Sequence, residues 1–179
     1  ESLSKQEERL YKKQVIFVGR LSKEKGILDL LTICENIPKE IDVIIIGTGP
    51  EENKVKLASK QDNIHYLGYL PPEKTIPLIR GSEILVQPSL IEGISSSILE
   101  SMACNTAIIA TNVGGNKEIL SNHTGILIQN PSEILTSIDK LYSNPTLRDS
   151  IIQNASTDVQ KYNWSIIGKQ YSQLYSSLS

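Results

Sequence analysis

Short apolar runs alternate with longer amphipathic stretches along most of the chain. Four of the runs are continuous and rich in β-branched residues, at residues 15–18, 43–46, 84–86 and 107–110. Uninterrupted runs of this kind are typical of strands buried on both faces. Shorter segments at 63–67 and 125–128 are predicted as further strands. We therefore expect a sheet that is covered on both sides.

Candidate helices lie between the predicted strands. They cover residues 26–36, 51–60, 73–80, 96–104 and 115–121, and after the last strand 131–143, 145–160 and 163–178. The alternation predicts an α/β fold, a Rossmann-like doubly wound parallel sheet with helices on both faces and a helical C-terminal tail. In such folds ligands bind beyond the carboxyl ends of the strands. The loops that follow strands should therefore hold the site.

The composition and net charge indicate which classes of protein this chain can belong to. With 179 residues, 39% hydrophobic and 21% charged, the chain is typical of a soluble globular domain with one substantial core. A net charge of -2 gives no field that would attract nucleic acid, so no nucleic-acid partner is expected. No apolar run approaches the roughly 20 residues of a membrane span. We expect a cytoplasmic domain, with membrane association not encoded in this sequence.

The same pattern divides the chain into a polar N-terminal segment and a folded domain. Residues 1–13 hold seven charged residues and are too polar for a signal peptide, so they are predicted as a linker or peripheral helix. Residues 14–179 are predicted as one folded domain.

Cys34 and Cys104 have no C-x-x-C motif or histidine cluster around them, which favours buried free thiols. His65 has no nearby carboxylate that suggests a relay and is interpreted as structural.

Two cations follow the first predicted strand. Arg20 stands at the strand end and Lys25 at the start of the next helix. Arginine offers a planar fork for phosphate oxygens and lysine a mobile point charge, so the pair suits a diphosphate that gains negative charge as it leaves. The alternative is a solvated basic loop with Glu24 as partner.

A second cluster follows the strand at 84–86. Gly93, Ile94, Ser95 and Ser96 lead into the helix at 96–104. Free backbone N–H groups and the positive end of the helix dipole should face the crevice there and hold a phosphate. The chain has no D-x-D pair, so we expect no metal and no cofactor.

Two carboxylates flank this helix start. Glu92 lies in the loop and Glu100 about one turn inside the helix. Carboxylates accept hydrogen bonds from sugar hydroxyls, so the two could bracket one ligand. The alternative for Glu100 is a capping box with Ser97, in which its side chain only reaches back to the helix start.

Glycine-rich loops follow two other strands. Gly47 and Gly49 come after the second buried strand, where Glu52 replaces the third glycine of a dinucleotide fingerprint. A close approach of ligand and a simple turn remain equally open for this loop. The loop at 112–116 has the same two interpretations.

Taken in order, these features resemble the carboxyl-terminal domain of glycosyltransferase family 4, retaining enzymes with the two-domain GT-B fold. The resemblance spans roughly residues 14–178. The residues that carry it are Gly19-Arg20-Leu21 with Lys25-Gly26, Gly47-x-Gly49-Pro50, Asn63 to Gly68, Pro88-Ser89, Glu92-Gly93 with Glu100, Ala110-Thr111 with Gly114-Gly115 and Glu118, and Gly125.

The resemblance implies a role for each matching residue. Arg20 and Lys25 would bind the donor diphosphate, Glu100 the ribose and Glu92 the transferred sugar. The backbone after Gly93 would bind the distal phosphate, and the base would lie against the loop that contains Leu70. Ser95 stands where the family usually has glycine, which suggests a different donor preference.

The resemblance also implies a metal-independent hexosyltransferase that uses a UDP- or GDP-sugar, with retention of configuration. Enzymes of this fold have an amino-terminal domain that binds the acceptor, and 179 residues cannot contain both, so catalysis should require a second half. Two alternatives stay open: a non-catalytic nucleotide-sugar-binding or assembly module, and a GT-B-like nucleotide-sugar epimerase.

Overall fold

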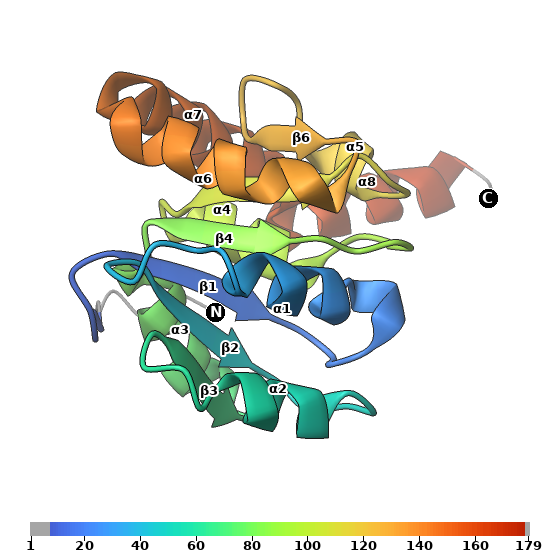
Figure 1. Cartoon of the computed structure of the whole chain (residues 1–179). Helices are drawn as coiled ribbons and strands as arrows, with labels where there is room; N and C mark the ends of the chain where they lie inside the picture. The colour runs from blue at the N-terminus through green and yellow to red at the C-terminus, as the bar shows by residue number, and fades with distance from the viewer. Residues whose placement is uncertain (1–7, 178–179) are drawn as a thin grey trace.

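The computed structural model describes residues 8–177 and consists of one parallel sheet between two layers of helices (Figure 1). The strands are β1 Gln14–Val18, β2 Asp42–Ile46, β3 Ile64–Gly68, β4 Ile84–Gln87, β5 Ala107–Thr111 and β6 Ile126–Ile128. They lie in the order β3-β2-β1-β4-β5-β6. The chain moves outward from β1 to β3 and then crosses back to β4, so β1 and β4 form the topological switch point. The predicted doubly wound α/β fold is confirmed.

The helices follow the predicted segments with small shifts at their ends. They are α1 Ile27–Cys34, α2 Glu52–Ala58, α3 Pro72–Gly81, α4 Ser96–Ala103, α5 Asn116–Ile119, α6 Ile134–Ser143, α7 Pro145–Asp158 and α8 Trp164–Ser177, with 3-10 turns η1 Lys23–Lys25, η2 Pro131–Glu133 and η3 Val159–Tyr162. The helix predicted at 115–121 is shorter because Leu120 is extended and buries its side chain. None of the helices in the described part of the chain combines the length and apolar composition of a membrane span.

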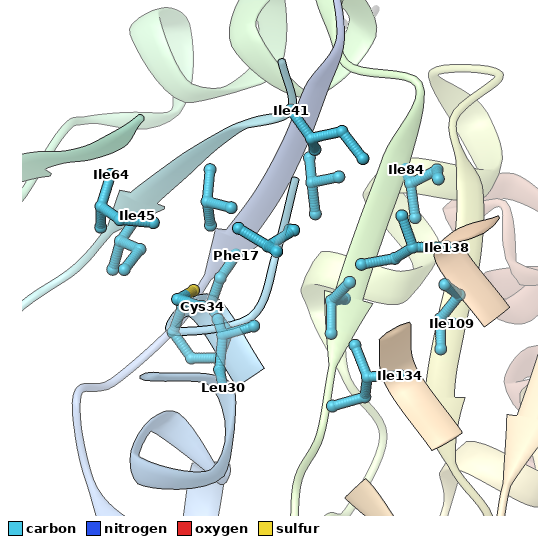
Figure 2. Packing of buried hydrophobic residues seen from close by; sticks show 14 of the residues in the cluster. Phe17, Leu30, Cys34, Ile41, Ile45, Ile64, Ile84, Ile109, Ile134 and Ile138 are labelled. Atoms are coloured by element: carbon cyan, nitrogen blue, oxygen red, sulfur yellow. The ribbon is translucent and has the colours of Figure 1, made fainter. Parts of the chain in front are cut away.

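Both faces of the sheet are covered, as the continuous apolar strands require. Val15 and Phe17 of β1 point into the core beneath α1, α2 and α6, whereas Ile16 points into the core beneath α3, α4 and α7. Figure 2 shows the first of these cores, where Cys34 of α1 packs beside Phe17. Cys34 and Cys104 are both buried and free, as predicted.

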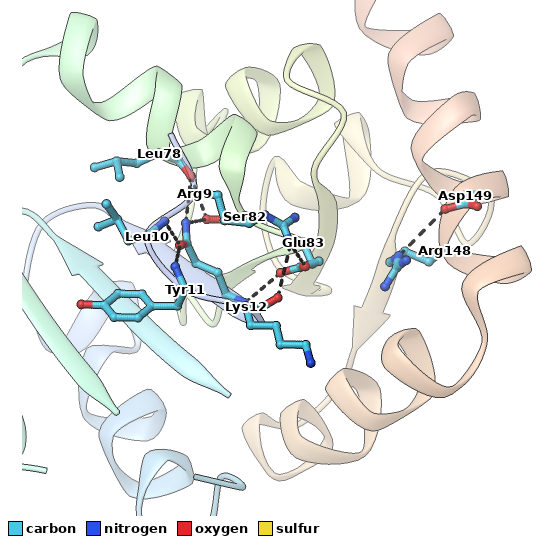
Figure 3. A network of polar contacts seen from close by, with 10 residues as sticks. Arg9, Leu10, Tyr11, Lys12, Leu78, Ser82, Glu83, Arg148 and Asp149 are labelled. Carbon is cyan, nitrogen blue, oxygen red and sulfur yellow. Dashed lines mark hydrogen bonds and ion pairs between the residues drawn. The ribbon is translucent and has the colours of Figure 1, made fainter. Parts of the chain in front are cut away.

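Contacts to Glu83 hold the segment before β1 against the connection between α3 and β4 (Figure 3). Arg9 Nη1 lies 2.6 Å from Glu83 Oε1, and the backbone N–H of Gln14 donates to Glu83 Oε2 at 2.8 Å. Residues 8–13 contain no helix, and residues 11–13 form bends. Residues 1–7 of the predicted linker lie outside the described residues.

Candidate functional site

The switch point between β1 and β4 holds a cavity of about 240 Å³, which we call the switch-point cavity. It is lined by Val18, Gly19, Arg20, Lys25, Gln87, Glu92, Ile94, Ser95, Ser96, Ser97 and Glu100. The fold thus brings the two predicted cations and the two predicted carboxylates to one place. They come from the loops after β1 and β4 and from the first turns of α4.

Arg20 and Lys25 reach the cavity from the loop after β1. Arg20 is exposed, and its guanidinium forms no hydrogen bond or ion pair with any residue in 8–177. The loop packs closely on the end of β4, because Gly26 has a positive φ of 70° and a Cβ there would overlap the carbonyl oxygen of Pro88. Glycine is therefore required at this position. Arg20 is therefore available to bind an anion, and the loop that presents it is fixed. Its charge also acts on Glu24: a side-chain hydrogen bond with Ser22 lowers the pKa of the Glu24 carboxyl, and the charge of Arg20 contributes to the same shift.

Lys25 is paired with Glu92. The Lys25 Nζ lies 2.6 Å from both carboxylate oxygens of Glu92, and Ser89 Oγ donates to Glu92 Oε2 at 3.0 Å. The Glu92 side chain is only 6% exposed. The basic-loop alternative, in which Glu24 is the partner of these cations, is therefore wrong for Lys25. Because this charge pair lines the cavity, an anionic ligand can replace Glu92 as the partner of Lys25. A cationic ligand can likewise replace Lys25 as the partner of Glu92.

The start of α4 is open toward the cavity. Ser95 is the N-cap residue in an extended conformation, and its side chain makes no capping hydrogen bond. The first N–H groups of a helix have no partner within the helix. Serine side chains surround this helix end, with Ser96 exposed and Ser95 buried. Backbone donors and the helix dipole make this end of the cavity favourable for an anion.

Glu100 does not form the capping box. The helix begins at Ser96, so Ser97 lies inside it, and Ser97 Oγ donates to Gln87 Oε1 at 3.1 Å instead. The capping alternative for Glu100 is wrong. Its carboxylate has no hydrogen-bond partner in the described part of the chain, and burial raises its pKa. A partly buried acceptor that lines a cavity and has no hydrogen-bond partner in residues 8–177 is available for ligand hydroxyls.

A larger cavity of about 540 Å³ adjoins the first and shares Val18, Gly19 and Arg20 with it. Gly47, Gly49 and Leu70 line this second cavity, so the loops after β2 and β3 form its far wall. Gly47 is fixed by its N–H, which donates to the Gly68 carbonyl at 2.8 Å. The Gly47 loop both turns the chain and lines a cavity, and a close approach of ligand there stays a prediction.

The loop after β5 supports the site from behind. The Gly115 N–H donates to the Glu92 carbonyl at 3.1 Å, and a Cβ at Gly115 would overlap the Gly93 carbonyl oxygen. Gly93 itself lines neither cavity. Thr111 Oγ1 donates to the Ser89 carbonyl, which anchors the same loop. The loop at 112–116 therefore positions Glu92.

One residue of the site and one polar pair outside it were not predicted. Gln87 at the end of β4 is 1% exposed and lines the switch-point cavity, and its polar side chain after an apolar run was the available signal. His65 pairs with Asp42 at 2.7 Å and stacks on Tyr11, which corrects the prediction that His65 lacks a nearby carboxylate. This pair lies near the amino ends of β2 and β3, away from the cavity.

Within residues 8–177, no group of three or more histidine, cysteine, aspartate or glutamate side chains is arranged to hold a metal ion.

Comparisons with known proteins find relatives of this chain among glycosyltransferases. The family model described as Glycosyl transferases group 1 matches residues 1–158. An uncharacterized glycosyltransferase from Methanocaldococcus jannaschii is 32% identical over 92% of this chain and 45% of its own length. The alpha-maltose-1-phosphate synthase of Mycolicibacterium smegmatis is 23% identical over 92% of this chain and 48% of its own length. The chain spans about half the length of the curated relatives it matches.

Solved structures share the fold. HepE from Anabaena in complex with UDP-glucose has a TM-score of 0.81 and 23% identity, over 92% of this chain and 48% of that one. The C-terminal domain of LpcC, a glycosyl transferase group 1 family protein from Francisella tularensis, has a TM-score of 0.73 and 28% identity. In that case the match covers 87% of this chain and 89% of the other, so the two are similar in extent.

Proposed function

Since the chain belongs to the Glycosyl transferases group 1 family, we propose that it is the donor-binding, carboxyl-terminal half of a family 4 glycosyltransferase. The reaction is transfer of a hexose from a UDP- or GDP-sugar, with retained configuration and without a metal. One observation carries the proposal: Arg20, Lys25, Glu92 and Glu100 meet at one cavity at the switch point of the sheet. Ligands of open α/β sheets bind at this point.

The diphosphate lies between the two cations and the start of α4. Arg20 binds phosphate oxygens with its planar fork, and Lys25 adds a point charge when it leaves Glu92. The open N–H groups at Ser96 and the next residues bind the distal phosphate. Because the leaving diphosphate gains negative charge, these donors stabilise the transition state more than the ground state. They supply the charge stabilisation that a metal ion provides elsewhere.

The two glutamates bind the sugars on either side. Glu100 accepts hydrogen bonds from the ribose, which its unpartnered and partly buried carboxylate favours. Glu92 accepts hydrogen bonds from the transferred hexose and lies beside the phosphate-binding residues. The base lies in the larger cavity against Gly47, Gly49 and Leu70, where main-chain groups of two loops contact it.

The second half of the enzyme binds the acceptor and closes over the donor. Helix α8 is the surface that we assign to it, since Trp164 is 83% and Tyr171 58% exposed there. A groove lined by Leu99, Glu100 and Trp164 leads from this helix to α4. The surface for the partner half therefore continues to the donor cavity, and transfer requires both halves.

Calorimetry tests the donor site directly. We expect UDP or GDP to bind this chain more tightly than ADP, and Arg20→Ala and Glu100→Ala to weaken binding while the far-UV circular dichroism stays unchanged. If none of the three nucleotides binds the folded wild-type chain, the assignment of the cavity is wrong.

The full-length protein tests the chemistry. We expect donor-dependent transfer that persists in EDTA, and NMR of the product should show the same anomeric configuration as in the donor. A non-catalytic module would bind the nucleotide without turnover. An epimerase would isomerise the sugar or release it without an acceptor.

A further inference from the structure

A buried series of hydrogen bonds joins the start of α4 to Glu92. Ser97 Oγ donates to Gln87 Oε1 at 3.1 Å, and Gln87 Nε2 donates to Ser89 Oγ at 2.9 Å. Ser89 Oγ donates to Glu92 Oε2 at 3.0 Å. Ser95 Oγ lies 3.0 Å from Ser97 Oγ and extends the series to the helix N-cap. We call these five side chains the Gln87 relay.

The relay is enclosed. Gln87 is 1% and Ser89 0% exposed, and the other two serines are buried as well. Gln87 ends a strand whose other three residues, 84–86, are fully apolar. A buried amide is unfavourable unless its donor and acceptor groups are paired. The amide is therefore held in one orientation by partners on both sides.

The direction of the relay is fixed by Glu92. Its carboxylate is paired with the Lys25 ammonium and can only accept hydrogen bonds, so Ser89 must donate to it. The lone pairs of Ser89 then accept from the Gln87 amide, which leaves the Gln87 oxygen for Ser97. Every dipole in the relay points its positive end toward the carboxylate, and linked dipoles of this kind reinforce one another.

We propose that Gln87 is a positioning residue that keeps the Glu92 carboxylate aimed into the switch-point cavity. Lys25 and Ser89 are the hydrogen-bond partners of this carboxylate in residues 8–177. When a diphosphate draws Lys25 away, Ser89 is the partner that remains, and Gln87 sets the orientation of Ser89. Gln87 acts through Ser89 and Glu92 rather than on the donor. The inference rests on the proposed function, because it assigns Glu92 to the transferred sugar.

The test compares a nucleotide with its sugar ester. Calorimetry on this chain with UDP and UDP-glucose, and with GDP and GDP-glucose, gives the affinity ratio that the sugar adds. We expect Gln87→Leu to lower this ratio about tenfold while the affinity for the free nucleotide changes less than about twofold. Thr106→Val is the matched control, because Thr106 is equally buried and its hydroxyl donates to the Ile79 carbonyl away from the cavity. The control should leave the ratio unchanged.

Two smaller changes, Ser89→Ala and Ser97→Ala, test the same proposal if Gln87→Leu does not fold. Ser89→Ala removes the last link and should lower the ratio as much as Gln87→Leu, whereas Ser97→Ala removes a distant link and should have a weaker effect. An unchanged ratio in Ser89→Ala and Gln87→Leu overturns the proposal. Equal losses of nucleotide and nucleotide-sugar affinity also overturn it, because Gln87 would then support the whole cavity.

A crystal structure separates failure of this inference from failure of the proposed function. If the wild-type chain binds neither nucleotide nor sugar ester, the donor-site assignment fails. The role of Gln87 is then tested by comparing crystal structures of the wild-type chain and of Gln87→Leu without a nucleotide. In Gln87→Leu the Glu92 carboxylate should move out of hydrogen-bond distance of Ser89. If it stays in the wild-type position, Gln87 does not position Glu92.

Discussion

The ammonium of Lys25 is held by both carboxylate oxygens of Glu92, 2.6 Å from each, although the two residues are 67 positions apart in the chain. Both lie in the proposed donor site, one for the diphosphate and one for the sugar. Each is therefore the ion-pair partner of the other in this structure. A diphosphate must compete with Glu92 for Lys25, and the same step frees Glu92 for the sugar.

This competition predicts opposite effects of Glu92→Gln on two ligands. The amide holds Lys25 less strongly and removes a negative charge near the phosphates, so UDP should bind about threefold tighter. The additional affinity for UDP-glucose over UDP should fall, because an acceptor for sugar hydroxyls is weakened. Calorimetry measures both. Glu73→Gln removes one charge outside both cavities and should change neither affinity, while weaker UDP binding in Glu92→Gln would contradict the competition.

Arg20 should matter for binding and not for folding. Its guanidinium is exposed and unpaired within residues 8–177, so Arg20→Ala should change the free energy of unfolding by less than about 0.5 kcal/mol. The affinity for UDP should fall about tenfold or more, as expected for lost charge-assisted hydrogen bonds. Lys23→Ala, an exposed lysine of the same loop that lines neither cavity, is the matched control. Equal effects of the two variants in calorimetry would show a general charge effect.

Much of the architecture could be predicted because its causes are local. Apolar runs such as 43–46 are continuous since both faces of the strand are buried, and this property is visible in the residues themselves. Arg20 and Glu92 could be placed near the site because each follows a buried strand. A parallel sheet then brings those loops to one edge.

What could not be predicted depends on distant pairs and on the exact start of a helix. The partners of Lys25 and His65 are 67 and 23 residues away, so the sequence near either residue does not reveal them. Glu100 had two interpretations because a capping box requires the helix to start after Ser97. The structure starts it at Ser96 and gives Ser97 another partner.

Glu100 should lower stability at neutral pH. Burial raises its pKa, so the folded state holds this proton to a higher pH than the unfolded state does. The contribution of Glu100 to stability is therefore present below the unfolded pKa, and it is lost as pH rises through the folded pKa. Glu100→Gln should raise the free energy of unfolding at pH 7 by less than about 1 kcal/mol, because the Glu100 side chain is only partly buried. The gain should disappear near pH 4.

Urea unfolding of both proteins at pH 7 and pH 4 measures this difference. The same variant should bind UDP more weakly, since the amide oxygen is a weaker acceptor for the ribose hydroxyls than the carboxylate. A variant that is destabilised at pH 7 would contradict the assigned environment of Glu100.

Both thiols should be unreactive in the folded chain. Burial raises the pKa of the Cys34 thiol to about 12 and also raises that of Cys104, so almost no thiolate is present at pH 8. We expect no reaction with a disulfide reagent within minutes under native conditions, and reaction of two thiols per chain after unfolding in about 8 M urea. Absorbance of the released thiolate measures both. Rapid native labelling of either cysteine would contradict its burial.

The contact between the β5 and β4 loops should control the geometry of the site. A Cβ at Gly115 would overlap the Gly93 carbonyl oxygen and lie 3.1 Å from the Ile94 N–H nitrogen, so Gly115→Ala must displace this loop. We expect a loss of about 1–3 kcal/mol in the free energy of unfolding, as for overpacked sites. UDP-glucose affinity should also fall, because the Gly115 N–H holds the Glu92 carbonyl.

Gly168→Ala is the matched control for this change. Gly168 lies within α8, and a Cβ added there would meet no atom within 4 Å, so alanine should be tolerated and should favour the helix. Urea titrations give the unfolding midpoints of both variants, and calorimetry gives their UDP-glucose affinities. If Gly115→Ala keeps wild-type stability and affinity, the loop at 112–116 only turns the chain, and Glu92 is positioned by β4 alone.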